Sequence, residues 1–124
     1  MAAPNIVNVS TITGKTSLTA LADTSATSVV SNAASSGKVF KINMIQVSNV
    51  DGAAAADISI DVHSAAAGGG TGYALASTIS VPADASLVVL DKNTALYLEE
   101  DKSIVATAGT GGDLEVIVSY EEIS

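Results

Sequence analysis

The stretch from Ile79 to Glu122 constrains the fold of this chain more than any other. It contains four short apolar runs, each followed by turn-forming residues. In the last run every second residue from Leu114 to Tyr120 is apolar, and the residues between them are polar except Ile117. Because successive side chains of a strand point to opposite faces, this run predicts a strand with one buried face.

Similar short runs recur along the whole chain at intervals of roughly 8–12 residues, with turn signals between them and no convincing helix. This pattern predicts an all-β, single-domain antiparallel sandwich of two sheets with about nine or ten short strands, either jelly-roll-like or immunoglobulin-like. We expect residues 1–13 to form an extended N-terminal arm that leads into the first strand, which Gly14 ends. Residues 14–124 then form the sandwich.

Several strands carry more specific expectations. A weak strand from Lys15 to Ala22 is expected to be anchored in the core by Leu18 and Leu21. From Lys38 to Val50 the apolar positions change parity, which predicts a β-bulge near Met44 and Ile45, or a strand that passes between the sheets.

Two connections between strands and one apolar run also carry expectations. Asp51-Gly52 is a turn pair, and a long hairpin to the next strand is one reading of it. The glycine-rich segment from Ser64 to Gly72 has no apolar anchor and is expected to be a flexible, exposed loop tip. The continuous apolar run from Leu87 to Leu90 indicates a strand that is buried on both faces.

The charge balance argues against a nucleic-acid ligand. Five lysines, no arginine and thirteen acidic residues give a net charge of -8, whereas phosphate binding needs clustered cations. The start of the chain lacks the pattern of a secretory signal, and no run is long enough for a membrane helix. We therefore expect a soluble protein with no membrane partner. The absence of cysteine excludes disulfides and thiolate metal sites.

No constellation of residues indicates chemistry. Asp57, Asp61 and His63 are expected on one face of a strand, but neighbouring positions there are about 6–7 Å apart, which is long for a shared metal ion. The acidic turn from Glu99 to Asp101 lacks the spacing of a calcium loop. The sequence therefore predicts no catalytic residue, no metal and no cofactor, and we do not expect an enzyme.

Three stretches carry a family resemblance: APNIVNVSTITGKT at the start, GKVFKINMIQVSNVDGAAAADISIDVH in the middle, and VPADASLVVLDKNTALYLEEDKSIVATA with GDLEVIVSYEEIS at the end. Together they resemble small virion structural proteins of tailed bacteriophages, especially marine phages of cyanobacteria. The resemblance implies a non-enzymatic component of the virion that is made in the host cytoplasm. It brings no catalytic residues with it.

Within that family we expect a capsid decoration (cement) protein that binds the outer surface of the major capsid protein shell as a homo-oligomer, with a trimer favoured. The alternatives are a neck, tail or fibre-associated protein of the same virion, or a carbohydrate-binding module for the host surface. The arm, from Pro4 to Thr13, is expected to add a strand to a neighbouring sheet. The loops from Asp51 to Ala56 and from Ala65 to Gly72 are the second choice for contacts. The expected partner-binding residues are Pro4, Asn5, Ile6, Val7, Val9, Ile12, Asp51, Gly52, Gly69 and Tyr73.

Overall fold

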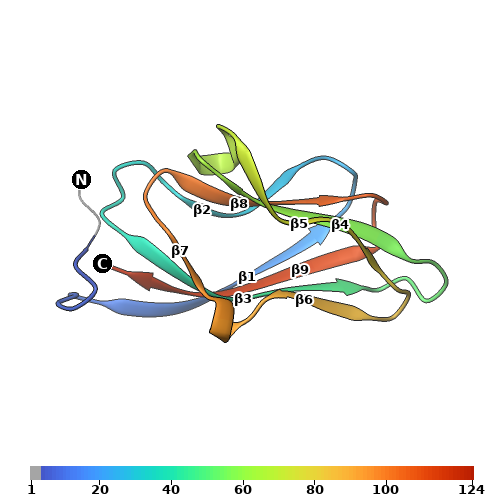
Figure 1. Cartoon of the computed structure of the whole chain (residues 1–124), viewed down its shortest axis with the longest axis horizontal. Helices are drawn as coiled ribbons and strands as arrows, with labels where there is room; N and C mark the ends of the chain where they lie inside the picture. The colour runs from blue at the N-terminus through green and yellow to red at the C-terminus, as the bar shows by residue number, and fades with distance from the viewer. Residues whose placement is uncertain (1–3) are drawn as a thin grey trace.

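The computed structural model describes residues 4–124 of the chain. In this part the regular elements are nine β-strands and two short 3-10 helices, arranged in two layers (Figure 1). The strands are β1 (Ile12–Leu21), β2 (Thr27–Asn32), β3 (Val39–Asn49), β4 (Ala56–His63), β5 (Gly72–Val81), β6 (Ser86–Leu90), β7 (Leu96–Leu98), β8 (Lys102–Ala108) and β9 (Leu114–Ile123). The 3-10 helices are η1 (Ala66–Gly68) and η2 (Lys92–Thr94).

The strand order identifies a jelly roll. One sheet has the order β1-β9-β3-β6, with β7 also paired to β3, and the other has the order β2-β8-β4-β5. All pairs are antiparallel. Successive pairs nest around the β4–β5 hairpin: β3 pairs with β6 and β7, β2 with β8, and β1 with β9. The β3–β9 and β4–β8 pairs complete the two sheets. The two-sheet sandwich is confirmed. The immunoglobulin-like alternative is wrong, because that fold places its first two strands in one sheet, whereas here they lie in different sheets.

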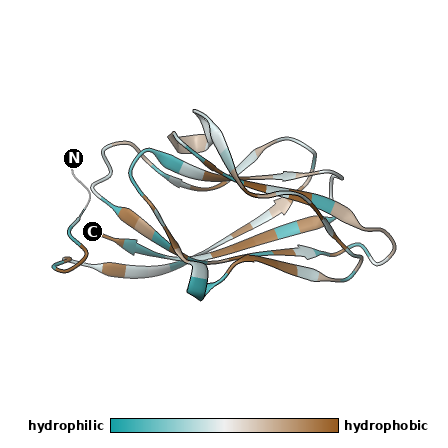
Figure 2. Ribbon diagram, in the orientation of Figure 1, coloured by the Kyte–Doolittle hydropathy of each residue, from teal (hydrophilic) through white to brown (hydrophobic). Residues whose placement is uncertain are grey.

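The core lies between the two sheets and consists mainly of aliphatic side chains. The predicted alternation of β9 is confirmed, because Leu114, Val116 and Val118 are almost fully buried. Figure 2 shows apolar residues along the strands, while η2 is hydrophilic. Aliphatic β-branched side chains suit this arrangement, since they fit closely between two pleated surfaces.

The predicted β-bulge in β3 is confirmed. The register of β3 against β9 shifts between Ile42 and Met44, so Asn43 is the extra residue. Ile42 on one side of the shift and Ile45 on the other are both completely buried. The bulge therefore lets one strand keep its apolar side chains in the core although their parity changes.

Two expectations for the first strand are wrong. Gly14 does not end a strand, because β1 continues through it and pairs it with Glu121. Leu18 is not a core anchor: its side chain is 75% exposed, whereas Leu21 is buried. The register with β9 explains the difference, since Leu18 lies opposite the outward-facing Ile117 and Leu21 opposite the buried Leu114.

Two expectations for later strands are also wrong. Asp51-Gly52 does not close a hairpin, because β3 and β4 belong to different sheets and the connection between them crosses from one layer to the other. The run from Leu87 to Leu90 is not buried on both faces, since β6 lies at a sheet edge and Val88 is 54% exposed.

Candidate interaction surfaces

The described residues 4–124 hold no group of three or more His, Asp or Glu side chains placed to bind a metal ion. They also contain no helix with the length and apolar character that crossing a membrane requires. The ring of His63 is engaged locally, with Nδ1 3.0 Å from the carbonyl oxygen of Gly69.

The N-terminal arm folds back onto the outer face of the β1-β9-β3-β6 sheet. Pro4 and Ile6 line a shallow pocket with Val39, Tyr97 and Glu99. Its volume is about 220 Å³. Part of the arm thus covers apolar surface of its own domain.

The base of the arm is held by the last residue of the chain. The amides of Ser10 and Thr11 both donate to the carbonyl oxygen of Ser124, and the Ser124 amide donates to the carbonyl of Thr11. Beyond this clamp the arm is exposed, and Val7 shows 91% of its surface. Ile6, at 52% exposed, and Val7 thus leave two adjacent apolar side chains on the surface beyond the clamp.

Strand β1 forms an open edge of its sheet. Thr11 and Ser124 exchange both backbone hydrogen bonds, so the N–H and C=O groups of Thr11 point toward β9. Backbone groups alternate in direction along a strand, and the register of β1 on β9 has no shift. The backbone groups of Ile12, Gly14, Thr16, Leu18 and Ala20 therefore point away from the sheet, on a side where no strand within residues 4–124 pairs with β1.

The other three sheet edges are interrupted, and β1 is not. Strand β2 has a register shift between Ser28 and Val30, and β5 has two shifts and a positive φ of 51° at Thr78. The edge opposite β1 is broken by η2, which separates β6 from β7. Bulges and breaks of this kind prevent sheet edges from pairing with other chains. An uninterrupted ten-residue edge is the opposite feature.

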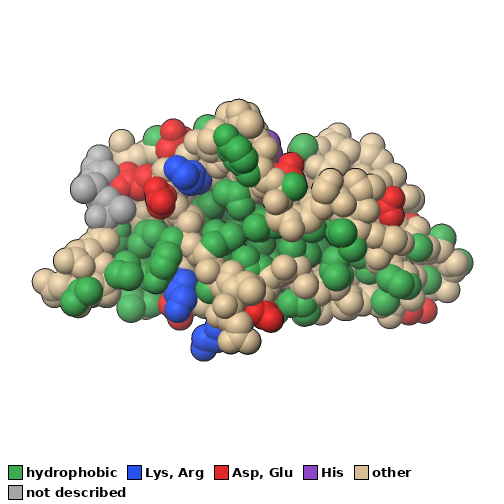
Figure 3. All heavy atoms as spheres, viewed as in Figure 1, with side chains coloured by type: hydrophobic (Ala, Val, Ile, Leu, Met, Phe, Trp, Pro, Cys, Tyr) green, Lys and Arg blue, Asp and Glu red, His purple; other side chains and the backbone are tan. Residues whose placement is uncertain are grey.

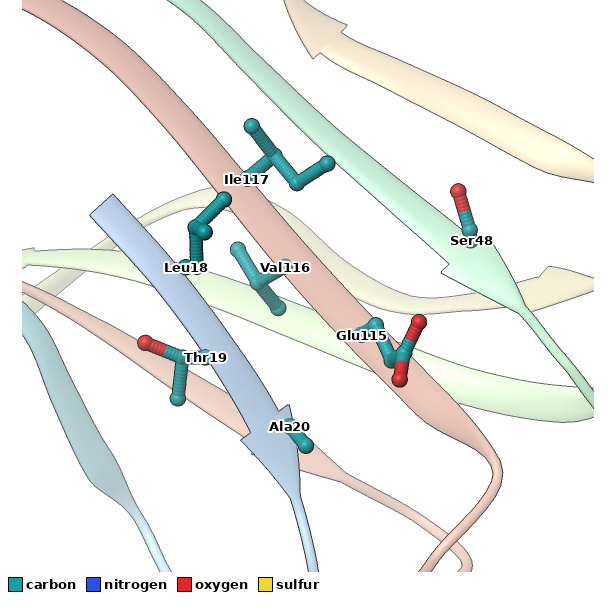
Figure 4. Close-up of a pocket in the computed structure, with 7 residues that line it drawn as sticks. All are labelled: Leu18, Thr19, Ala20, Ser48, Glu115, Val116 and Ile117. Atoms are coloured by element: carbon teal, nitrogen blue, oxygen red, sulfur yellow. The ribbon is translucent and has the colours of Figure 1, made fainter. Parts of the chain in front are cut away.

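A row of outward-facing residues, apolar except for Gln46, crosses the outer face of the same sheet. Leu18 lies opposite Ile117, Ile117 opposite Gln46, and Gln46 opposite Val88. Figure 4 shows Leu18 and Ile117 side by side next to a groove of about 330 Å³, which Glu115 also lines. This row runs from the open edge at β1 toward the far edge of the sheet.

The end of the sandwich opposite the arm is acidic. Loops alternate between the two ends, so the loops after β1, β3, β5 and β8 share this end, and backbone hydrogen bonds connect them, such as Val50 N to Asp113 O. In Figure 3 the lysines on the visible face lie in the half nearer the N-terminus. The acidic residues in these loops and the adjoining strand ends are Asp23, Asp51, Asp57, Asp84, Asp113 and Glu115.

The glycine-rich loop between β4 and β5 is anchored, contrary to the expectation of a loop without an anchor. The buried Ser103 accepts from the amide of Gly68 and donates to the carbonyl of Ala65. The amide of Ala67 donates to Ser31 Oγ, and that of Ala66 donates to Asp101 Oδ1. These polar partners come from other strands and loops, which is why the local sequence does not reveal them.

One ion-pair cluster closes the arm end of the sandwich. The carboxylate of Glu122 lies 3.1 Å from Lys15 Nζ and 2.6 Å from Lys38 Nζ. The hydrogen bond from Lys38 is the largest cause that holds the pKa of Glu122 below its ordinary value, with Lys15 adding to it against partial burial. The hydrogen bond and charge of Glu122 in turn raise the pKa of Lys15.

Comparison with known proteins shows a similarity of fold. No known sequence family and no curated protein matches the chain. A chain of the solved structure described as "Bacillus endospore appendages form a novel family of disulfide-linked pili" superposes with a TM-score of 0.52. The two chains are 16% identical, and the match covers 92% of this chain and 88% of that one. The match therefore shows a similar fold over nearly the whole chain.

The structure does not bring the predicted contact residues together. Asp51 and Gly52 lie at the acidic end, whereas the predicted arm residues and Gly69 belong to the opposite end. Tyr73 is 66% exposed at the start of β5, in the other sheet from β1. Sequence reasoning missed Leu18 and Val88, because their outward direction depends on strand pairing and not on local alternation.

Proposed function

We propose that this protein is a non-enzymatic structural subunit that binds to a larger protein assembly. The observation that carries the proposal is the apolar arm, which leaves Val7 91% exposed and is fixed at its base beside the open edge strand β1. Backbone hydrogen bonds along such an edge supply affinity for another extended chain. Repetition over many copies then makes attachment strong even when each contact is weak.

More specifically, the assembly is a tailed-phage virion, and the protein decorates the outer surface of the major capsid protein shell. This choice is supported by the resemblance of the start, middle and end of the sequence to phage virion proteins. The arm residues Ile6, Val7 and Val9 are the contacts with the shell.

A second candidate is a subunit of a filamentous appendage, which the fold similarity to the Bacillus protein favours. That protein belongs to disulfide-linked pili, whereas this chain contains no cysteine. A filament of this protein would be held by non-covalent contacts alone. Negative-stain electron microscopy of the purified protein distinguishes the candidates, because only an appendage subunit forms filaments without a capsid.

A carbohydrate-binding role has less support. Sugar platforms use exposed aromatic rings, and the exposed tyrosines are Tyr73 and Tyr97. Tyr73 is in β5 and Tyr97 in β7, so they belong to different sheets. They do not make a shared surface for one sugar chain.

The decoration proposal is tested by adding purified protein to phage particles stripped of it and measuring co-sedimentation and copy number. Many copies on the shell support decoration of the capsid. A few copies at one vertex support the neck or tail instead, and recovery only in the supernatant contradicts a virion role.

A further inference from the structure

The free edge of β1 can pair only with a strand that matches the direction of its backbone hydrogen bonds and the face on which its side chains lie. The side chains of Thr16 and Leu18 point outward from the sandwich, and the backbone groups of Gly14, Thr16 and Leu18 point to the free edge. An antiparallel partner must therefore present residues whose backbone groups point to the shared edge and whose side chains lie on the outer face. Only such a partner extends the sheet without inverting its faces. Strand β1 itself meets both requirements.

We propose that β1 binds β1 of a second copy across a two-fold axis perpendicular to the sheet. The inference goes beyond the proposed function: it assigns the β1 edge to a second copy of this protein, whereas the arm makes the contacts with the larger assembly. Isologous pairing of this kind matches each free donor with a free acceptor of the other copy. The two sheets that contain β1 become one continuous sheet.

The shape of the edge selects the register. Leu18 is the most exposed large apolar side chain of β1, at 75%. Gly14 has open space, because a Cβ atom built there meets nothing within 4 Å. Centring the two-fold axis on Thr16 places Leu18 of each copy opposite Gly14 of the other, so the bulky side chain enters the vacant position. The same register places Ile12 opposite Ala20.

The charge distribution selects the antiparallel direction. The acidic end holds six carboxylates, namely Asp23, Asp51, Asp57, Asp84, Asp113 and Glu115, and none of the five lysines. Parallel pairing would bring two such ends together. Antiparallel pairing places the acidic end of one copy beside the end of the other that holds Lys15, Lys38 and Lys41. That end also carries Glu99, Glu100, Asp101, Glu121 and Glu122, so its lysines only offset its own acids. The antiparallel direction is favoured because it avoids bringing two acidic ends without lysines together in a chain whose net charge is -8.

Cysteine trapping tests the register directly, because the chain has no cysteine of its own. On the two-fold axis the two Thr16 Cα atoms would be about 5.5 Å apart, which is within disulfide range. We expect Thr16→Cys to form a disulfide-linked dimer rapidly under mild oxidation. Thr110→Cys, in an exposed loop, is the matched control. Leu18→Cys tests the register, because the two copies of residue 18 would be about 13 Å apart.

The proposal is supported if Thr16→Cys links much faster than both controls. It is overturned if all three variants link at the same rate, or if Leu18→Cys links faster than Thr16→Cys.

A second experiment uses no cysteine. Analytical ultracentrifugation should show a concentration-dependent dimer for the wild-type protein and for Thr16→Ala. Thr16→Pro should be monomeric and folded, because the amide it loses points to the free edge and proline is tolerated there. A wild-type protein that stays monomeric at high concentration, or a folded Thr16→Pro that still dimerises, overturns the proposal.

Discussion

Lys38 holds the carboxylate of Glu122 at a distance of 2.6 Å, and this contact ties the start of β3 to the end of β9. Lys15 of β1 reaches the other carboxylate oxygen, so a single acidic side chain connects three strands at the arm end. The side chain of Glu122 is only 15% exposed, which reduces screening of the pair by solvent. The open edge strand is thereby fixed to its own sheet.

This cluster predicts a pH dependence of stability. The pKa of Glu122 is lowered in the folded state, below the ordinary value of 4.5. As pH falls the unfolded state therefore takes up the proton first, so the stabilisation is complete above the unfolded pKa and is lost as pH falls through the folded pKa. We expect Glu122→Gln to lose up to about 1 kcal/mol at neutral pH and to show a weaker acid dependence. Urea denaturation over a series of pH values measures both effects, and an unchanged acid dependence would count against the cluster.

The face assignment of β9 predicts opposite results for two neighbouring residues. Val116→Asp places an unpaired charge in the core, where Val116 is 1% exposed, and should prevent folding. Ile117→Asp, on the outer face, should leave a folded β protein. Circular dichroism and the cooperativity of unfolding check the pair. A soluble, cooperatively unfolding Val116→Asp variant would show that the face assignment is inverted.

Two glycines predict contrasting responses to the same substitution. Gly70 has a φ of +66°, and a Cβ atom there would lie 2.4 Å from Ser64 Oγ. We expect Gly70→Ala to destabilise the protein by about 1–3 kcal/mol. Gly14 lies in open space within a strand, so Gly14→Ala should be neutral or stabilise by up to about 1 kcal/mol. Thermal unfolding of the two variants gives the comparison, and equal effects would contradict it.

The anchoring of the glycine-rich loop predicts that removing the Ser103 hydroxyl group lowers the stability of the fold. Ser103→Ala removes both hydrogen bonds that seat the loop and leaves the amide of Gly68 without its partner. The expected loss is about 1–3 kcal/mol, with faster amide exchange in the loop. Ser28→Ala, at an exposed position of β2, should change stability by less than about 0.5 kcal/mol. Unchanged exchange in Ser103→Ala would mean that the loop is held by other contacts.

The sequence predicts those parts of the fold that local alternation determines. The faces of β9 and the bulge after Ile42 follow from the parity of apolar residues alone. Leu18 could not be placed in this way, because its direction is set by Ile117, far along the chain. The same reason explains the missed anchor at Ser103. The open edge at β1 emerges only from the strand order, since no local pattern says which strand lacks a neighbour.

The arm carries the attachment proposal most directly. Deleting residues 2–9 removes Ile6, Val7 and Val9 but keeps the hydrogen bonds of Ser10 and Thr11 to Ser124, so the sandwich should still fold. A full-length variant with serine at those three positions is the matched control for arm length. Co-sedimentation with stripped phage particles is the decisive measurement. We predict that the wild-type protein pellets with the particles and that both variants stay in the supernatant. If all three stay in the supernatant, or if the variants pellet as well as the wild type, arm-mediated attachment to a virion is contradicted.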